Sequence, residues 1–180
     1  MMTLARIGVL LGAFAAAGGA CADGIEPFLG EYRGHSISDT ASGLEERDLS
    51  VVIRGKGRGG FVVEWTTVSR GSTSGKLRKK SYAVEFIPTK RPNIYSSAMK
   101  TNLFGGREAM DPLKGDPYVW GRIAGRTLTV YALIITDEGG YEMQVYERTL
   151  TDPGRMDLEF SRVRDGRVLK QIRGTLERVQ

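Results

Sequence analysis

The sequence predicts an all-β protein: a single antiparallel up-and-down β-barrel of eight to ten strands that follows an N-terminal signal peptide. Apolar and polar residues alternate at period two along most of the chain, which is typical of strands with one buried face. Residue pairs that favour tight turns separate the alternating runs at short intervals. No window after residue 23 has a clear 3.6-residue period, so we expect no long helix in the mature chain.

The first 22 residues are typical of a secretory signal peptide. Arg6 supplies the positive charge, residues 7–17 are apolar, and residues 20–22 have the small-x-small pattern that precedes a signal peptidase site. About 11 apolar residues are too few to cross a bilayer, which takes about 20. We therefore expect cleavage after residue 22 and a periplasmic or secreted protein. The alternative is a lipoprotein anchored through Cys21.

Cleavage leaves residues 23–180, the size of one domain with its own core. Cys21 is the only cysteine, so no disulfide can stabilise the mature fold and packing must do so. The mature chain keeps all but one of the 26 Lys and Arg residues against 21 Asp and Glu residues. This mild basic excess favours anionic partners, such as lipopolysaccharide or lipid head groups, without specifying one.

The alternating runs assign one face of each expected strand to the core. Turn pairs such as Pro153-Gly154 and Asp165-Gly166 separate the runs and supply the positive φ angles of tight hairpins, so successive strands should pair antiparallel. We expect strands at 27–38, 46–55, 60–70, 76–88, 92–100, 117–123, 126–136, 140–150, 155–164 and 166–179. The residues assigned to buried faces are Leu49, Val51, Ile53, Phe61, Val63, Trp65, Tyr82, Val84, Phe86, Met143, Val145, Met156, Leu158, Phe160, Val168, Ile172 and Leu176.

Strands joined by hairpins avoid exposed edges by closing into a barrel or by stacking as a sandwich, and the near absence of long crossovers favours the barrel. The one long connection is Thr101–Asp116, which contains apolar Phe104 and Leu113. It is either a lid over a bound molecule or a plug over one end of the core. Residues 128–135 are apolar on both faces, which favours a central strand or a subunit contact.

The first expected strand reads F-L-G-E-Y-R-G over residues 28–34. This resembles the G-x-W opening strand of the calycins, the lipocalin and avidin-like barrels, with Tyr32 in place of the usual Trp. The resemblance implies that Tyr32 closes one end of the barrel and that a basic residue of the last strand, Arg173 or Arg178, packs across it. It also implies a small apolar ligand inside the barrel, although some bacterial members of the superfamily have no known ligand.

The residue types do not support a catalytic or metal site. His35 is the only histidine and the only cysteine lies in the signal segment, so the several His or Cys ligands of a transition-metal site are absent. A Ser-His or Cys-His site would have to be built on His35, which is better explained as a surface or barrel-rim residue. No EF-hand, P-loop or G-x-S-x-G pattern is present. Acidic runs such as residues 45–48 are explained by a solvated face. We expect no cofactor, no enzymatic activity and no nucleic-acid partner.

The leading hypothesis is an exported, non-catalytic barrel that binds a small apolar or amphipathic ligand. Aromatic residues are the candidates for lining its cavity, although aromatic residues in small barrels often only fill the core. The candidate ligand-binding residues are Tyr32, Phe61, Trp65, Phe104 and Trp120, with Tyr131 and Tyr146 as further aromatic candidates.

The alternative is an envelope interaction or structural protein that contacts lipopolysaccharide or a protein partner through its outer surface. Its contact would be the basic cluster Lys76, Arg78, Lys79 and Lys80, or the strand at 128–135. Such a cluster is equally explained as a solvated strand end that blocks edge-to-edge pairing.

Overall fold

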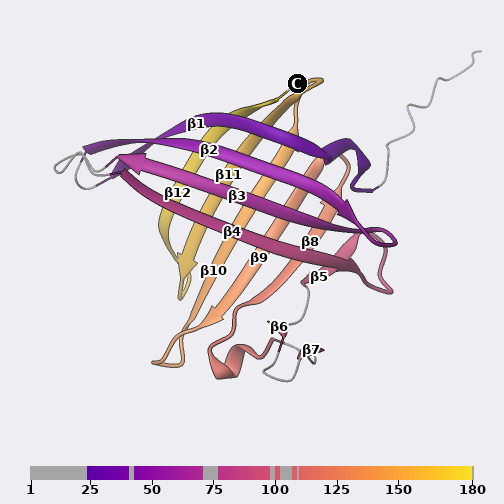
Figure 1. Ribbon diagram of the computed structural model, residues 1–180. Helices are drawn as coiled ribbons and strands as arrows, with labels where there is room; N and C mark the ends of the chain where they lie inside the picture. Colours follow the sequence, from indigo (N-terminus) through magenta and orange to yellow (C-terminus); the bar gives the residue numbers. More distant parts are fainter. Residues whose placement is uncertain are drawn as a thin grey trace, which may run out of the picture.

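The computed structural model describes residues 24–40, 43–70, 77–97, 100–101, 107–108 and 110–179. They form a closed ten-strand antiparallel barrel with the strand order β1-β12-β11-β10-β9-β8-β5-β4-β3-β2, which confirms the predicted fold class (Figure 1). The signal segment with Cys21, and also Lys76 and Phe104, lie outside the described residues. No helix among the described residues is long and apolar enough to span a membrane.

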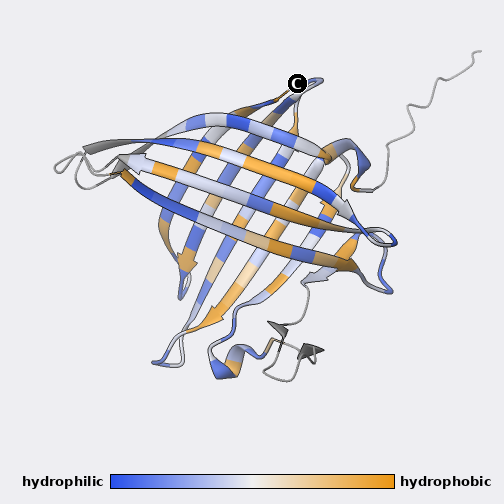
Figure 2. Ribbon diagram, in the orientation of Figure 1, coloured by the Kyte–Doolittle hydropathy of each residue, from blue (hydrophilic) through white to orange (hydrophobic). Residues whose placement is uncertain are grey.

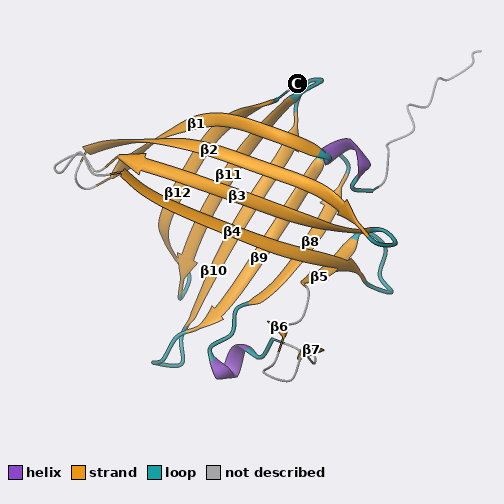
Figure 3. Ribbon diagram, viewed as in Figure 1, coloured by secondary structure: helices purple, strands orange, loops and turns teal. Residues whose placement is uncertain are grey.

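Short turns join most of the consecutive barrel strands, whereas a long connection joins β5 to β8, and two 3₁₀-helices lie near the ends of the barrel (Figure 3). The strands are β1 (Gly30–Thr40), β2 (Gly43–Lys56), β3 (Gly60–Arg70), β4 (Leu77–Pro88), β5 (Ile94–Ser97), β8 (Tyr118–Ala124), β9 (Thr127–Ile135), β10 (Tyr141–Leu150), β11 (Arg155–Arg164) and β12 (Arg167–Arg178). The helices are η1 (Glu26–Phe28) and η2 (Pro112–Lys114).

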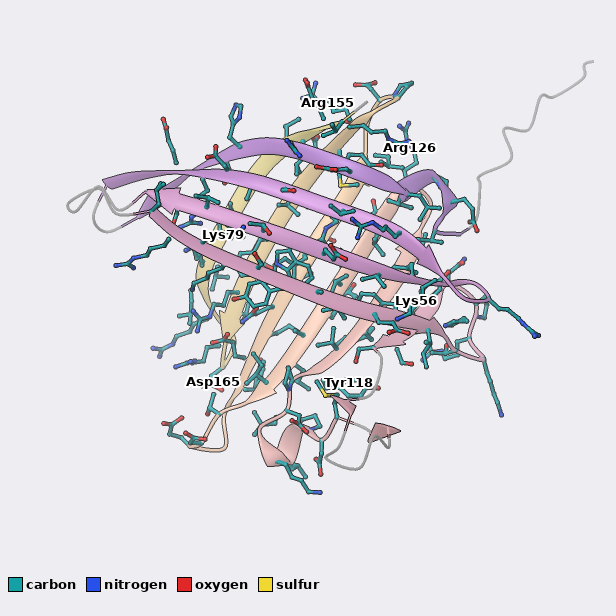
Figure 4. The ribbon with its side chains drawn as sticks, in the orientation of Figure 1. Lys56, Lys79, Tyr118, Arg126, Arg155 and Asp165 are labelled. Atoms are coloured by element: carbon teal, nitrogen blue, oxygen red, sulfur yellow. The ribbon has the colours of Figure 1, made fainter. Side chains whose placement is uncertain are left out.

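Strands β1–β4 form one side of the barrel and β8–β12 form the other, and the two sides cross one another (Figure 1). The short strand β5 joins them, because it pairs with β4 on one edge and with β8 on the other. Pairing of β1 with β12 closes the barrel on the opposite side. Side chains lie in the space between the two sides. Arg126 and Arg155 mark hairpins at one end, and Asp165 marks a hairpin at the other (Figure 4).

The hairpins form at the turn pairs that the sequence predicted. Asp165 and Gly166 have φ angles of 47° and 77° and lie between Arg164 and Arg167, which pair directly. Two consecutive residues with positive φ are the requirement of a type I′ turn. The Asp165 carboxylate also accepts a hydrogen bond from the backbone N–H of Tyr141 at 2.9 Å, so the turn is held against the start of β10.

One end of the interior is a packed apolar core. Apolar residues alternate with polar ones along the strands (Figure 2), and the ring of Phe61 lies 4.9 Å from those of both Phe86 and Tyr95. A Cβ atom on Gly121 would lie 3.3 Å from the Phe86 ring, so the wall approaches the core closely here. We call this half, with η1 across it, the packed end. Its buried residues are Ile25, Phe28, Tyr32, Val51, Ile53, Phe61, Val63, Phe86, Tyr95, Ile123, Leu128, Val130, Leu150, Met156 and Leu176.

Tyr32 closes the packed end, as the calycin resemblance implies. Its ring is fully buried, and its hydroxyl donates to the carbonyl oxygen of Phe28 at 3.1 Å. Arg178 donates from Nη2 to the Tyr32 hydroxyl at 2.7 Å and to the carbonyl oxygen of Pro27 at 3.0 Å. Its Cζ lies 5.2 Å from the centre of the Tyr32 ring. The predicted pairing is therefore confirmed with Arg178, while Arg173 pairs with Glu159 instead.

The long connection before β8 differs from the prediction. It contains two short strands, β6 (Lys100–Thr101) and β7 (Arg107–Glu108), which pair with each other, and it ends in η2. Asp111 begins η2 by accepting a hydrogen bond from the backbone N–H of Leu113 at 3.0 Å. Leu113 itself is 86% exposed, so this apolar residue does not pack on the core.

Candidate functional site: the polar end of the barrel interior

The strand register shows which side chains face the interior. Phe61 pairs with Phe86 and Val63 with Val84, and these residues lie in the core or pack against it. Side chains two residues apart share a face of a strand, so the next pairs along β3 and β4 also face inward. These pairs are Trp65 with Tyr82, Thr67 with Lys80, and Ser69 with Arg78. The inner face of β3 and β4 therefore changes from apolar to polar and cationic.

Strands β10 and β11 show the same change. Leu150 pairs with Met156 in the core, and the following inward pairs are Arg148 with Leu158, Tyr146 with Phe160, Gln144 with Arg162, and Glu142 with Arg164. On both sides of the barrel, the inward-facing side chains therefore become polar with increasing distance from the packed end. We call this half of the interior, from Trp65 and Tyr146 outward to Arg78 and Arg164, the polar end.

A row of aromatic rings crosses the interior where the two halves meet. The ring of Trp65 lies 5.3 Å from that of Tyr82 and 5.2 Å from that of Tyr146, and Tyr146 lies 4.7 Å from Phe160. The row joins β3 and β4 to β10 and β11 across the barrel. Tyr82 faces inward yet is 51% exposed, so protein side chains do not fill the space beside it.

Arg148 lies beneath this row and is the largest fully buried side chain of the described residues, at 1% exposure. Its Cζ atom lies 5.4 Å from the centre of the Trp65 ring and 5.7 Å from that of Tyr146. Within the described part of the chain, its Nε and Nη1 atoms have no hydrogen-bond partner. Burial lowers the pKa of Arg148 to about 10, so the guanidinium still carries its charge at neutral pH.

Glu142, the one carboxylate among the described inward-facing side chains of the barrel strands, is bound to other cations. Arg162 and Arg164 contact its Oε2 atom at 2.6 and 3.1 Å, and Gln144 donates to Oε1 at 2.8 Å. The hydrogen bond from Arg162 is the main reason that the pKa of Glu142 falls to about 2. Both oxygens of Glu142 are therefore engaged, and neither contacts Arg148.

The same network fixes Tyr146. Its hydroxyl donates to Oε1 of Gln144 at 3.0 Å, so a chain of hydrogen bonds runs from Tyr146 through Gln144 and Glu142 to the two arginines. Burial raises the pKa of Tyr146 to about 12. The phenol therefore stays neutral, and its ring is held in one orientation against the guanidinium of Arg148.

The residues named from the sequence fall in three places. Trp65 and Tyr146 are part of the aromatic row, whereas Tyr32 and Phe61 are fully buried in the packed end. Trp120 lies on the outer face of β8, because its neighbour Gly121 faces the Phe86 ring. There it stacks on Tyr131 at 4.8 Å and contacts Tyr118 at 5.7 Å, so it does not line the interior.

The basic cluster is divided between two faces of β4. Arg78 and Lys80 pair with inward-facing residues of β3, while Lys79 lies between them on the outer face (Figure 4). The cluster is therefore not one continuous patch of the outer surface. Two of its cations belong to the polar end of the interior.

Sequence reasoning did not find Arg148, Glu142, Gln144 or Arg162. It assigned Met143 and Val145 to the buried face of their strand, but the register places these two on the outer face, opposite Leu133 and Tyr131 of β9. A usable signal was present, because the other face of β10 reads Glu, Gln, Tyr and Arg at alternate positions. Alternating polar residues on one face of a strand are expected where that face lines a polar part of the barrel interior.

Comparisons with known proteins bear on the fold alone. No family model and no curated protein matches this chain. The S-type phycobiliprotein lyase CPES from Guillardia theta has a similar structure, with 11% identity, a TM-score of 0.50, and coverage of 87% of this chain and 90% of that one. Rv2717c from M. tuberculosis shares 13% identity with a TM-score of 0.49, over 87% of this chain and 95% of that one. At 11% identity, the likeness to the lyase concerns the fold alone.

Proposed function

We propose that this chain is an exported, non-catalytic barrel that binds a small amphipathic molecule in the polar end of its interior. The observation that carries the proposal is Tyr82, a ring on the inner face of the wall that is nevertheless 51% exposed. Ligand sites are concave, lined mainly by aromatic and apolar side chains, and supplied with a few polar groups. The aromatic row with Arg148 beneath it has that composition.

The titration behaviour of the site supports binding rather than catalysis. A general acid or base needs a pKa near the working pH. The pKa values of Tyr146 and Arg148 are about 12 and about 10, and that of Glu142 is about 2, so none of the three exchanges a proton readily near neutrality. These groups can orient and hold a ligand, but they are poorly suited to moving protons.

The division of the basic cluster also favours the interior over the outer surface. Arg78 and Lys80, which the surface hypothesis requires on the outside, share the inner face with Trp65 and Tyr82. There they add positive charge to the entrance of the site. Cations around an entrance raise the local concentration of anionic molecules and the rate at which they bind.

Native mass spectrometry of the protein purified from its own host tests the proposal. We expect a chain that begins at residue 23 and carries a small molecule, which is lost on denaturation. A fully folded protein that carries no bound molecule would contradict ligand binding. A chain that keeps residues 1–22 in the cytoplasmic fraction would contradict export.

Two tryptophans provide matched variants for the location of the site. Trp65→Ala should lower the affinity for a bound hydrophobic probe by about tenfold, the effect of losing one stacking ring, and Tyr82→Ser should lower it less. Trp120→Ala should leave the affinity unchanged, because Trp120 lies on the outer wall. Equal losses for Trp65→Ala and Trp120→Ala would place the binding surface elsewhere.

A further inference from the structure

We infer that the molecule bound in the polar end is an anion, and that its carboxylate or similar oxyanion is held by the guanidinium of Arg148. This inference rests on the proposed function and names the ligand class. Arg148 is almost completely buried, and Nε and Nη1 have no partner within the described part of the chain. Burying a charge costs free energy unless a counter-charge or hydrogen bonds compensate for it.

The surrounding wall does not supply that compensation. The residues that pair with Arg148 on the two neighbouring strands are Leu128 on β9 and Leu158 on β11, and neither side chain can accept a hydrogen bond. The rings of Trp65 and Tyr146 contribute cation–π attraction at 5.4 and 5.7 Å, but they accept no hydrogen bond in the guanidinium plane.

The nearby carboxylate is not free to act as the counter-ion. Both oxygens of Glu142 are occupied by Arg162, Arg164 and Gln144, and Gln144 also accepts the hydroxyl proton of Tyr146. The carboxylate of this network makes no contact with Arg148, and its two arginine partners leave a surplus of positive charge at the polar end. A bound anion would satisfy the unused donors of Arg148 and balance this charge.

The neighbours of Arg148 define the rest of the ligand. A guanidinium is planar and presents several N–H donors, which suits an oxyanion with at least two oxygens. The adjacent surface is the ring row of Trp65, Tyr146 and Phe160, which ends at the exposed ring of Tyr82. The ligand is therefore an amphipathic acid whose apolar, preferably planar, body lies along this row.

Access to Arg148 requires one covering ring to move, because the residue is 1% exposed. Tyr146 is held by its hydrogen bond to Gln144. Trp65 is held by ring contacts and by packing on the core, with no hydrogen bond to its ring among the described residues. Binding should therefore displace Trp65. In a Trp120→Phe background Trp65 is the single tryptophan, so a shift of its emission reports this movement.

The test uses two probes with the same ring system, pyrenebutyric acid and its neutral counterpart pyrenebutanol, titrated against the full chain by fluorescence anisotropy. The protein should bind the acid about tenfold more tightly than the alcohol, the usual gain from a charge-assisted pair. Arg148→Met should remove this preference and leave the affinity for the alcohol within about threefold. Arg173→Met is the control, because Arg173 pairs with Glu159 on the outer face.

A second measurement needs no ligand. Removing a buried charge that lacks a partner should raise the melting temperature of the empty protein, since the desolvation cost disappears. Equal affinity for both probes, or an Arg148→Met protein that melts lower or does not fold, would overturn the inference while leaving the barrel a binding protein. Failure of both probes to bind, together with an empty native protein, would instead overturn the proposed function.

Discussion

Replacement of Tyr32 by Ala tests the closure of the packed end. The ring is fully buried beneath η1, and truncating a buried aromatic ring to Ala costs about 3 to 5 kcal/mol. The variant also loses the hydrogen bond from the hydroxyl to Phe28 and leaves one contact of Arg178 unmade. Each such bond contributes about 1 kcal/mol. Because these effects overlap, we expect the free energy of unfolding to fall by about 4 kcal/mol in total.

Urea denaturation followed by circular dichroism measures this change, and at about 2 to 4 °C per kcal/mol the melting temperature should fall by roughly 10 °C. Tyr32→Phe keeps the ring beside Arg178 and should cost only about 1 to 2 kcal/mol, and Tyr32→Trp should be tolerated. Tyr141→Ala is the matched control, because Tyr141 is 42% exposed. A Tyr32→Ala protein that melts like the parent would refute the role given to this residue.

Two further predictions concern the walls. The pKa of Glu142 falls from its usual 4.5 to about 2, so its contribution to stability is complete above about pH 4.5 and is lost as the pH falls toward 2. Glu142→Gln should flatten the pH dependence of unfolding in that window, and an unchanged slope would contradict the ion-pair network. Gly121→Ala should destabilise by about 1 to 3 kcal/mol through its contact with Phe86. Gly55→Ala is the control and should not destabilise the protein, because its added Cβ meets no atom within 4 Å. Equal melting temperatures of the two variants would contradict the close contact between Gly121 and Phe86.

Much of the architecture is a local property of the chain, and the sequence alone determines it. Alternation at period two predicts where the strands lie. Pairs such as Asp165-Gly166 predict where the chain turns, because the turn itself requires positive φ. Short turns between successive strands make the pairing antiparallel, and closing such a sheet into a barrel leaves no exposed edge. The position of Tyr32 at one end was also predictable, through the calycin resemblance of residues 28–34.

The tertiary structure decides what the alternation leaves open, namely which face of a strand is inside. Arg173 and Arg178 lie on opposite faces of β12, and only the register of β12 with β1 places Arg178 opposite Tyr32. On β10, hydrophobicity favours the face with Met143 and Val145, yet pairing with β9 and β11 turns the opposite face inward. Alternation at period two separates the residues of a strand into two faces, but it does not determine which face points into the barrel.

The candidate site depends on barrel closure in the same way. Trp65 on β3 and Arg148 on β10 come within 5.4 Å only because two distant segments form opposite sides of one barrel. The sequence predicted Trp65 as a buried and candidate ligand-binding residue, but it gave no signal that Arg148 lies beside it. An arginine is expected to be exposed because burying its charge is costly. Only the folded chain shows that Arg148 is buried, with Nε and Nη1 lacking a hydrogen-bond partner among the described residues.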